Sequence, residues 1–411
     1  MTRTPPNEAQ AAGSDAAGGA SASHGRSGGS LLPPDARARR AARAKRGGRP
    51  PVPHRRNVSP RGPCENRPVT RRADRPGSLR LHREGVLTRR IEALETLLDP
   101  CALCPRACRA LRRSGDLGTC ATGPLPVVAS WTPHFGEEPV ISGRRGSGTV
   151  FLANCNLRCV FCQNHDISQK PRTFRDSAMT DEDLAAIHLE LQDRGCHNVN
   201  WVSPTHQVPA LVRGLDLAIR RGFGLPLVYN TNAYDSVEVL RLLDGVVDVY
   251  LPDLKYADPA AGRECSRVPD YPDRAREAIR EMFLQVGDRW TLSPDGTLLR
   301  GLLVRILVLP NDLAGVEESL RWIAEELSPR VGISLMAQYY PTHHAAQPGR
   351  YPLLQRPISA GEWDRALEAL ERWTAGDHRY IQDFREAPGY YRPDFSDSEK
   401  PFPDLDDFLP R

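Results

Sequence analysis

The sequence predicts an α/β fold, a full or partial (β/α) barrel, and two observations support this class. Short apolar runs rich in β-branched and aromatic residues recur along the chain, and amphipathic helices alternate with them. Such alternation indicates parallel strands joined by right-handed crossovers. The alternating part covers about 230 residues, which suits one barrel better than two domains. A doubly wound open sheet is the alternative, because periodicity does not report whether a sheet closes.

The elements can be placed individually. Three helices are expected: one over residues 87–98, one after the capping signal that begins at Thr180, and one over residues 316–327. The predicted strands are 149–153, 198–202, 225–229, 246–251, 302–308 and 332–336. Because active sites of α/β barrels lie at the carboxyl ends of the strands, we expect the chemistry in the loops that follow these runs.

Charge divides the 411 residues unevenly. The formal charge is +4, but residues 1–90 hold 20 basic and 6 acidic side chains, so they carry +14 and the remaining 321 residues carry −10. The first segment has few large apolar residues to bury, which predicts disorder. We expect a disordered Arg-rich arm over 1–85, a Cys-rich metal-binding module over 86–125, the barrel over 126–385 and an extended acidic tail over 386–411.

Two classes of protein are excluded by composition. No stretch approaches the roughly 18 uninterrupted apolar residues of a membrane-spanning helix. The first residues do not resemble a secretory signal, so we expect a cytoplasmic protein without a membrane partner. In that reducing compartment the ten cysteines are expected to serve metal binding or chemistry rather than disulfides.

A loop directly after the first predicted strand holds Cys155, Cys159 and Cys162. Three thiolates can hold three corners of a 4Fe-4S cluster and leave the fourth iron open. An open metal position distinguishes a catalytic site from a structural one, as it does for zinc. The alternatives are a zinc site completed by a distant ligand such as His165, or three unligated thiols.

Polar side chains follow most of the other strands at the same edge. They are Ser203, Thr205, His206, Asn230, Thr231, Asn232, Asp253 and Lys255. Asp253 and Lys255 are two residues apart at a strand end, so their side chains are expected to point the same way and to bind the two ends of a zwitterion. His206 is a candidate for substrate contact or proton handling, because histidine titrates near neutrality. Each residue alone is explained equally well as a helix cap or a loop hydrogen bond.

A second cysteine cluster lies upstream, with four thiols in twenty residues. Its members are Cys101, Cys104, Cys108 and Cys120. Four soft ligands close a coordination shell, which fits either zinc or a saturated iron-sulfur cluster. Neighbouring arginines would lower the thiol pKa and offset cluster charge. Unligated thiols are the alternative here too, and Cys64, Cys196 and Cys265 are interpreted as ordinary thiols.

The spacing Cys155-x3-Cys159-x2-Cys162, with Phe161 before the third cysteine, resembles the signature of the radical S-adenosylmethionine (radical SAM) superfamily. Further segments resemble its uncharacterised branch related to pyruvate formate-lyase activating enzymes, over roughly residues 95–385. These segments are Cys104-Pro-Arg-Ala-Cys108, His197-Asn-Val-Asn-Trp-Val-Ser-Pro-Thr-His206, Val228-Tyr-Asn-Thr-Asn232, Leu251-Pro-Asp-Leu-Lys255 and Leu335-Met-Ala-Gln-Tyr-Tyr-Pro341.

The resemblance implies an oxidoreductase with a 4Fe-4S cluster and S-adenosylmethionine as cofactors. A one-electron donor such as flavodoxin or ferredoxin would reduce the cluster, and cleavage would yield methionine and a 5′-deoxyadenosyl radical that abstracts hydrogen from the substrate. The substrate would be a protein glycine, as in glycyl-radical activating enzymes, or a small molecule. The resemblance carries a role in the S-adenosylmethionine pocket over to Asn230, Thr231, Asp253 and Lys255. Together with the residues above, we expect catalytic roles for Lys255 and His206, and cofactor binding for Phe161, Ser203, Thr205, Asn230, Thr231, Asn232 and Asp253.

The chain departs from the superfamily pattern after the second strand. Many members place a Gly-Gly-Glu-like motif there to hold the methionine amino group, whereas this chain has Val202-Ser-Pro-Thr205. We therefore expect Ser203 or Thr205 to supply that contact through hydroxyl or backbone.

The alternative function is a zinc-stabilised binding module that engages nucleic acid through its basic arm. It accounts for the arm and the upstream cysteines but not for the open three-cysteine loop. The −10 charge of the remaining chain argues against a nucleic-acid surface there, so no nucleic-acid partner is expected.

Overall fold

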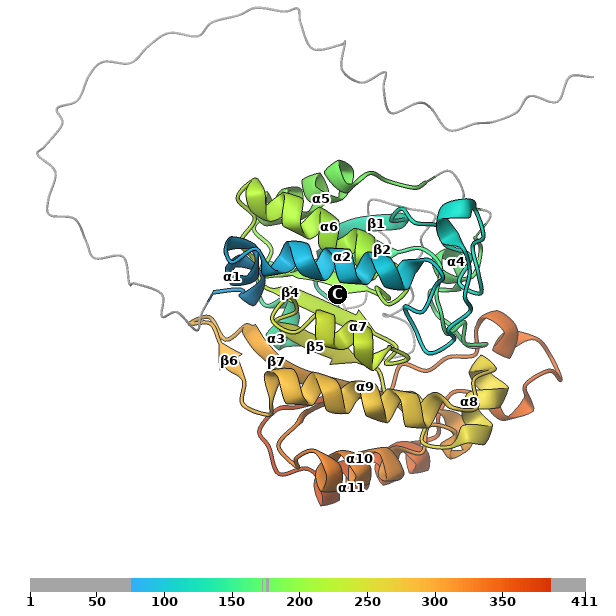
Figure 1. Cartoon of the computed structure of the whole chain (residues 1–411). Coiled ribbons are helices and arrows are strands. Elements are labelled where there is room, and N and C mark those ends of the chain that lie inside the picture. The colour runs from blue at the N-terminus through green and yellow to red at the C-terminus, as the bar shows by residue number, and fades with distance from the viewer. Residues whose placement is uncertain (1–74, 172, 175–176, 386–411) are drawn as a thin grey trace, which may run out of the picture. The chain divides into compact units, whose positions relative to one another are not determined.

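The computed structural model describes residues 75–171, 173–174 and 177–385 (Figure 1). Two compact units are distinguished along the chain, 1–66 and 67–411, and every described residue belongs to the second. The predicted acidic tail over 386–411 and the predicted arm up to residue 74 lie outside the described residues.

The prediction that the disordered arm reaches residue 85 is wrong at its carboxyl end. Helix α1 (Gly77–Arg83) is formed there, and Leu81 is buried. The Gly77 N–H donates to the Asp248 carboxylate at 2.9 Å, and His82 contacts Asp216 at 2.7 Å. Few apolar residues mark this segment, and its order comes from the burial of Leu81 and from contacts with residues far along the chain.

A nine-stranded sheet forms the centre of the described residues. Its strands are β1 (Val128–His134), β2 (Ser147–Leu152), β3 (Val199–Val202), β4 (Leu227–Thr231), β5 (Val249–Pro252), β6 (Thr291–Leu292), β7 (Leu298–Leu307), β8 (Gly332–Met336) and β9 (Arg379–Ile381). The order is β1-β2-β3-β4-β5-β7-β8-β9, with β6 added to β7. The six predicted strands are β2, β3, β4, β5, β7 and β8, and each pairs with its neighbour in parallel, which confirms the α/β class.

The sheet is a partial barrel. Its order ends at β1 on one side and at β9 on the other, and in the described part of the chain these two strands do not pair with each other. Strand β1 runs antiparallel to β2, and β9 adds in parallel to β8. Neither was predicted, because β1 is half-exposed and contains Pro133, and β9 has three residues that are exposed or half-buried.

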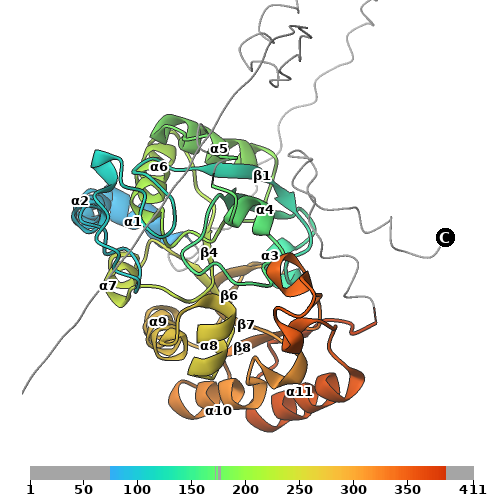
Figure 2. The same ribbon diagram turned by 90° about the vertical axis from the view of Figure 1, so that its right-hand side faces the viewer.

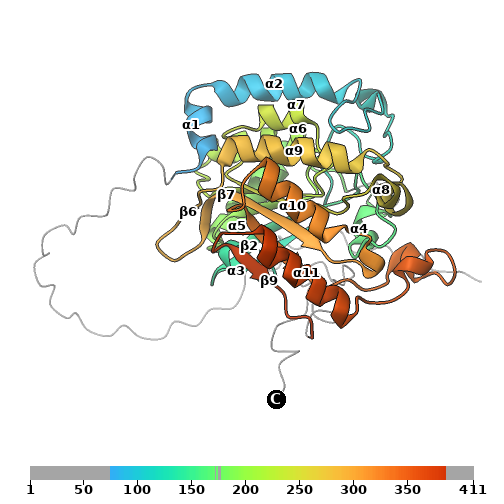
Figure 3. The same cartoon turned by 90° about the horizontal axis from the view of Figure 1, so that it is seen from below.

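Helices cover the outer face of the sheet in an arc (Figure 2). The principal ones are α2 (Val86–Leu98), α5 (Asp181–Asp193), α6 (Val208–Arg220), α7 (Val237–Leu242), α9 (Tyr271–Val286), α10 (Val316–Glu326) and α11 (Ala360–Trp373). Short helices are α3 (Pro139–Ser142), α4 (His165–Ser168) and α8 (Pro259–Ser266). Figure 3 shows α9, α10 and α11 following one another across β7 and β8. The three predicted helices are α2, α5 and α10, and α5 begins with the expected capping box at Thr180.

The lower interior of the barrel is filled. Helix α3 places Val140 and Ile141 among the buried side chains Val228, Val249 and Leu303. An apolar layer at this level leaves the carboxyl ends of the strands as the place where a ligand can enter.

Residues 86–125 are packed with the barrel. Helix α2 lies against α6 and α7, and the cysteine-containing loop that follows it contacts the loop after β2. Both segments belong to one compact unit. No helix within the described ranges is long and apolar enough to cross a membrane.

Candidate functional site

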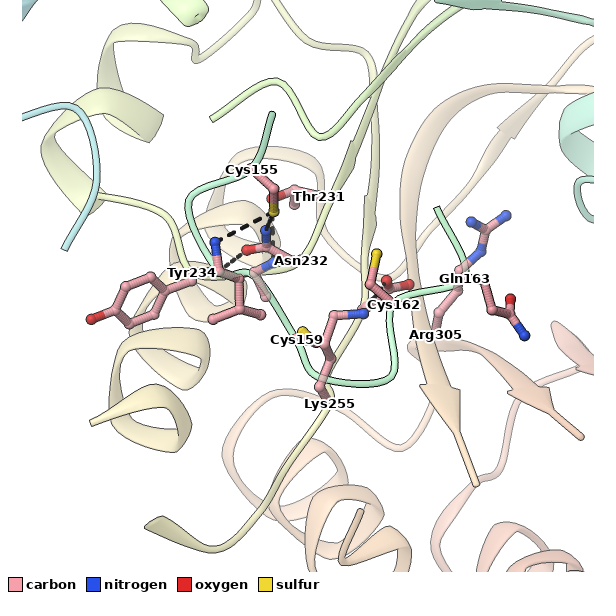
Figure 4. Close-up of polar contacts among 12 residues, drawn as sticks. Cys155, Cys159, Cys162, Gln163, Thr231, Asn232, Tyr234, Lys255 and Arg305 are labelled. Atoms are coloured by element: carbon pink, nitrogen blue, oxygen red, sulfur yellow. Dashed lines mark hydrogen bonds and ion pairs between the residues drawn. The ribbon is translucent and has the colours of Figure 1, made fainter. Parts of the chain in front are cut away.

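A cavity of about 660 Å³ lies at the carboxyl ends of the strands. Most of the site residues predicted from the sequence line it: Cys155, Cys159, Phe161, Cys162, Ser203, Asn230, Thr231, Asn232, Asp253 and Lys255. Figure 4 shows the three cysteines on one loop, with Asn232 and Lys255 beside them. The structure therefore brings together side chains that are up to 100 residues apart in the sequence.

Each thiol of this loop is within reach of one polar neighbour. The Asn232 amide donates to Cys155 Sγ at 3.5 Å, the Ser266 hydroxyl donates to Cys159 Sγ at 3.2 Å, and Ser168 Oγ lies 3.3 Å from Cys162 Sγ. Burial raises the pKa of Cys159, and it raises the pKa of Cys162 to about 12. Metal binding must displace these protons, since the thiolate is the ligand.

The donor set fits a cluster. Three thiols open on one cavity, and soft thiolates are the ligands that iron-sulfur clusters take. Among the described residues, no group of three or more His, Cys, Asp or Glu side chains is arranged to hold a metal ion. A cluster poses a different requirement, because each cysteine binds its own iron and the sulfurs stand farther apart than around one ion.

Asp253 and Lys255 form an ion pair in the cavity wall, as their spacing predicts. Lys255 Nζ donates to Asp253 Oδ2 at 2.8 Å. Burial alone would lower the pKa of Lys255, but the Asp253 carboxylate and the Cys159 sulfur raise it overall. The Tyr271 hydroxyl donates to the Asp253 carbonyl at 2.8 Å and accepts the Lys255 N–H at 2.9 Å, which fixes the strand end. The Asp253–Lys255 pair is therefore held in place in the cavity wall.

The structure places Thr205, for which we expect a contact with the cofactor, behind the cavity wall. Thr205 is buried and does not line the cavity, because its hydroxyl donates to Asp235 at 2.7 Å. Asp235 also accepts the hydroxyls of Thr231 and Tyr229. Ser203 does line the cavity, and its φ of 58° turns the chain so that the following residues lie behind the wall.

The structure also places His206, for which we expect substrate contact or proton handling, away from the cavity. His206 is buried outside the cavity, with Nε2 3.0 Å from the Ala153 carbonyl. Burial, and then the nearby Arg112, lower the pKa of His206 to about 3. A neutral imidazole at this place supports the residue just before the cysteine loop.

Several charged residues of the cavity were not predicted from the sequence, among them three that contact one another. Arg305 on β7 donates to both carboxylates of the pair Glu137 and Glu138, which precede α3. Glu137 also accepts from Asn200 at 2.9 Å and from Asn230 at 3.4 Å. Burial alone would raise the pKa of Glu138, but Arg305 lowers it overall. One feature of the sequence could have revealed them, namely the charged Arg305 within an otherwise apolar predicted strand.

Comparison with known proteins agrees with this geometry. The sequence model of the radical SAM superfamily matches residues 149–285, which include the three-cysteine loop, Asp253 and Lys255. An uncharacterised protein of Methanocaldococcus jannaschii is 30% identical over 295 residues, which cover 70% of this chain and 79% of that protein. The chain belongs to the radical SAM superfamily. Members of this superfamily cleave S-adenosylmethionine reductively at a 4Fe-4S cluster, so the chain is an iron-sulfur enzyme of this class.

Proposed function

We propose that this enzyme is of the pyruvate formate-lyase activating type, with its catalytic cluster held by Cys155, Cys159 and Cys162. The observation that carries the proposal is one cavity shared by three thiols and the Asp253–Lys255 ion pair. Three ligands leave one iron for the amino and carboxylate groups of S-adenosylmethionine. The bound cofactors supply the electron and the radical, and the protein binds, orients and excludes water.

The polar wall supplies the contacts that a zwitterionic cofactor needs. Lys255 offers a fixed ammonium to the methionine carboxylate, and Asp253 offers an acceptor next to it. Asn230 faces the cavity from β4 and contacts Glu137 below it. Ser203 and Asn232 complete the rim on either side. Phe161 packs edge-on against Tyr256 and Tyr339, which holds the end of the cysteine loop against the barrel.

The proposed substrate is a glycine residue of a protein. The cavity is open between β1 and β9, where its lining includes His134, Gly136 and Ile381. Ile381 of this lining exposes 52% of its surface, and Phe135, which lies between the lining residues His134 and Gly136 in the sequence, exposes 51%. Apolar side chains around a mouth favour a partner larger than the cavity, and a glycine has no side chain to exclude its Cα hydrogen from the 5′ carbon.

The first test is S-adenosylmethionine cleavage. Anaerobically reconstituted protein should be brown and, when reduced with dithionite, should release 5′-deoxyadenosine and methionine in equal amounts. A colourless protein that holds only zinc would overturn the proposal.

The second test identifies the substrate class. The reduced enzyme is mixed with extract of cells grown on α-deuterated glycine, and deuterium in 5′-deoxyadenosine is measured by mass spectrometry. We expect transfer from the macromolecular fraction, with loss of the signal after protease treatment. Transfer from the small-molecule fraction alone would contradict a protein glycine.

A further inference from the structure

The four upstream thiols lie together in one loop. Cys101 interacts electrostatically with Cys108 and Cys120, and Cys104 interacts with Cys101 and Cys120. All four are free thiols. The loop is folded closely over Cys108, since a Cβ on Gly118 would lie 2.8 Å from its Sγ.

The backbone of this loop turns N–H groups toward the sulfur atoms. Each sulfur receives the backbone N–H of the residue two positions further on, and the pairs are Cys101 with Leu103, Cys104 with Arg106, Cys108 with Ala110 and Cys120 with Thr122. Left-handed residues in the same loop, Ala107 at φ 39° and Arg109 at φ 59°, accommodate these turns. The loop is therefore folded around its four sulfur atoms.

A buried cation faces the same sulfur atoms. Arg112 is 2% exposed, and its guanidinium donates to Cys120 Sγ at 3.0 Å and to the His206 carbonyl at 2.6 Å. Its Nε has no partner, and no carboxylate in the described ranges pairs with it. A buried charge without a counter-charge costs several kcal/mol. Metal-bound thiolates would supply the missing negative charge.

One side chain connects this loop to the catalytic loop. The side chain of Asn156 interacts electrostatically with Cys104, its Oδ1 lies 3.9 Å from Cys155 Sγ, and this oxygen accepts from Asn232 at 2.9 Å. Arg106 adds a second bridge by donating to the carbonyls of Asn156 and Leu157. The two sets of thiols are therefore separated by little more than one asparagine.

We propose that Cys101, Cys104, Cys108 and Cys120 hold a second iron-sulfur cluster that passes electrons to the catalytic cluster through the contact at Asn156. The role as electron relay rests on the proposed function. One electron from a low-potential protein donor of flavodoxin or ferredoxin type enters this cluster, and the same electron leaves it for the catalytic cluster, without a bond or a proton changing.

The surface of the loop suits this route. Cys108 is half-buried, and its neighbours Arg109, Leu111 and Arg113 are exposed. A donor can therefore approach this side while cofactor and substrate fill the cavity. The basic side chains favour an acidic donor.

The test separates the two sites. In one variant Cys155, Cys159 and Cys162 are all changed to alanine, and in the other Cys101, Cys104, Cys108 and Cys120 are changed. Both full-length proteins are reconstituted anaerobically, iron, sulfide and zinc are counted, and paramagnetic resonance spectra are recorded after reduction. Cys196→Ala, at a buried thiol outside both loops, is the matched control.

The first variant should retain about four iron and four sulfide ions and show a reducible cluster, although it cannot cleave S-adenosylmethionine. Zinc in place of iron, or no metal, would overturn the proposal whatever the catalytic loop does. The wild type should hold about twice that iron. In Asn156→Ala the catalytic cluster should be reduced at least about tenfold more slowly by ferredoxin in stopped-flow absorbance. An unchanged rate of reduction of the catalytic cluster would show that Asn156 does not carry electrons between the clusters.

Discussion

The two cysteine loops are built in opposite ways. The loop of Cys155, Cys159 and Cys162 opens on a 660 Å³ cavity that is lined by an ion pair and by amides. The upstream loop contributes none of the cavity-lining residues in the described part of the chain. Its sulfurs instead face backbone N–H groups and the guanidinium of Arg112.

This difference in surroundings assigns the catalytic role to the three-cysteine loop and a supporting role to the upstream loop. Three thiols beside empty volume leave a coordination position for a cofactor, whereas four thiols enclosed by donors leave none. The distinction is one of surroundings, because the ligand type is the same. Contacts through Asn156 and Arg106 then link the two loops directly.

Cysteine replacement should give the largest difference between the loops. With dithionite as reductant, Cys159→Ala should lower S-adenosylmethionine cleavage at least about 10³-fold, equal to about 4 kcal/mol, because the cluster loses one of its three ligands. Cys104→Ala should lower it only about tenfold, since a small reductant can bypass the upstream loop. The rate of 5′-deoxyadenosine formation measures both, with Cys196→Ala as control. Equal losses would contradict the division of roles.

The role of the Asp253–Lys255 ion pair in cofactor binding can be tested by replacing two lysines, Lys255 and Lys170. Lys255→Met leaves Asp253 without its partner and should weaken S-adenosylmethionine binding about 10- to 100-fold by titration calorimetry. Lys170→Met removes an exposed pair with Asp166, whose side chains are 56% and 43% exposed, and should change affinity less than about twofold. Similar effects of both changes would show that Lys255 is not part of the cofactor site.

The charge balance of the upstream cysteine loop can be tested at two neighbouring arginines, Arg112 and Arg113. Arg112→Gln removes the buried cation and should destabilise the iron-loaded protein by about 2 kcal/mol in urea unfolding, but not the metal-free protein, where the charge is uncompensated. Arg113→Gln removes a partly exposed ion pair with Glu95 and should cost less than about 0.5 kcal/mol in either form. Equal losses with and without iron would mean that Arg112 does not balance a metal site.

The sequence predicted the framework of the fold better than its boundaries. Six parallel strands followed from apolar runs, because a strand buried on both faces needs such a run. Strands β1 and β9 carry no such signal, as most residues of β1 are half-buried and two of the three residues of β9 are exposed. The closure of the barrel could therefore not be predicted, because it depends on two strands that the hydrophobic periodicity does not reveal.

The site shows the same limit at the level of single residues. Asp253 and Lys255 meet as predicted, because alternation within an extended strand fixes their side. Thr205 and His206 lie outside the cavity, because the left-handed Ser203 turns the chain at the strand end and alternation no longer applies. The contact of Arg305 with Glu138 spans 167 residues, a separation that no local pattern reports.

His206 lies between the two loops and gives the smallest expected effect. Burial and Arg112 hold its pKa near 3, below the ordinary value of about 6.5, so the neutral form is favoured in the folded state. Stability from this residue is complete above pH 6.5 and is lost as the pH falls toward 3, by about 1.4 kcal/mol between pH 7 and 5.5. In His206→Gln this pH-dependent loss of the free energy of unfolding should disappear when unfolding is measured in urea.

His188→Gln, at a histidine whose pKa burial lowers to about 4, is the matched control and should remove a similar pH-dependent loss of stability. Only the change at His206, which contacts Ala153 and Arg112, should also alter the paramagnetic resonance spectra of the clusters. An identical response of both variants would mean that His206 stabilises the fold without coupling the loops.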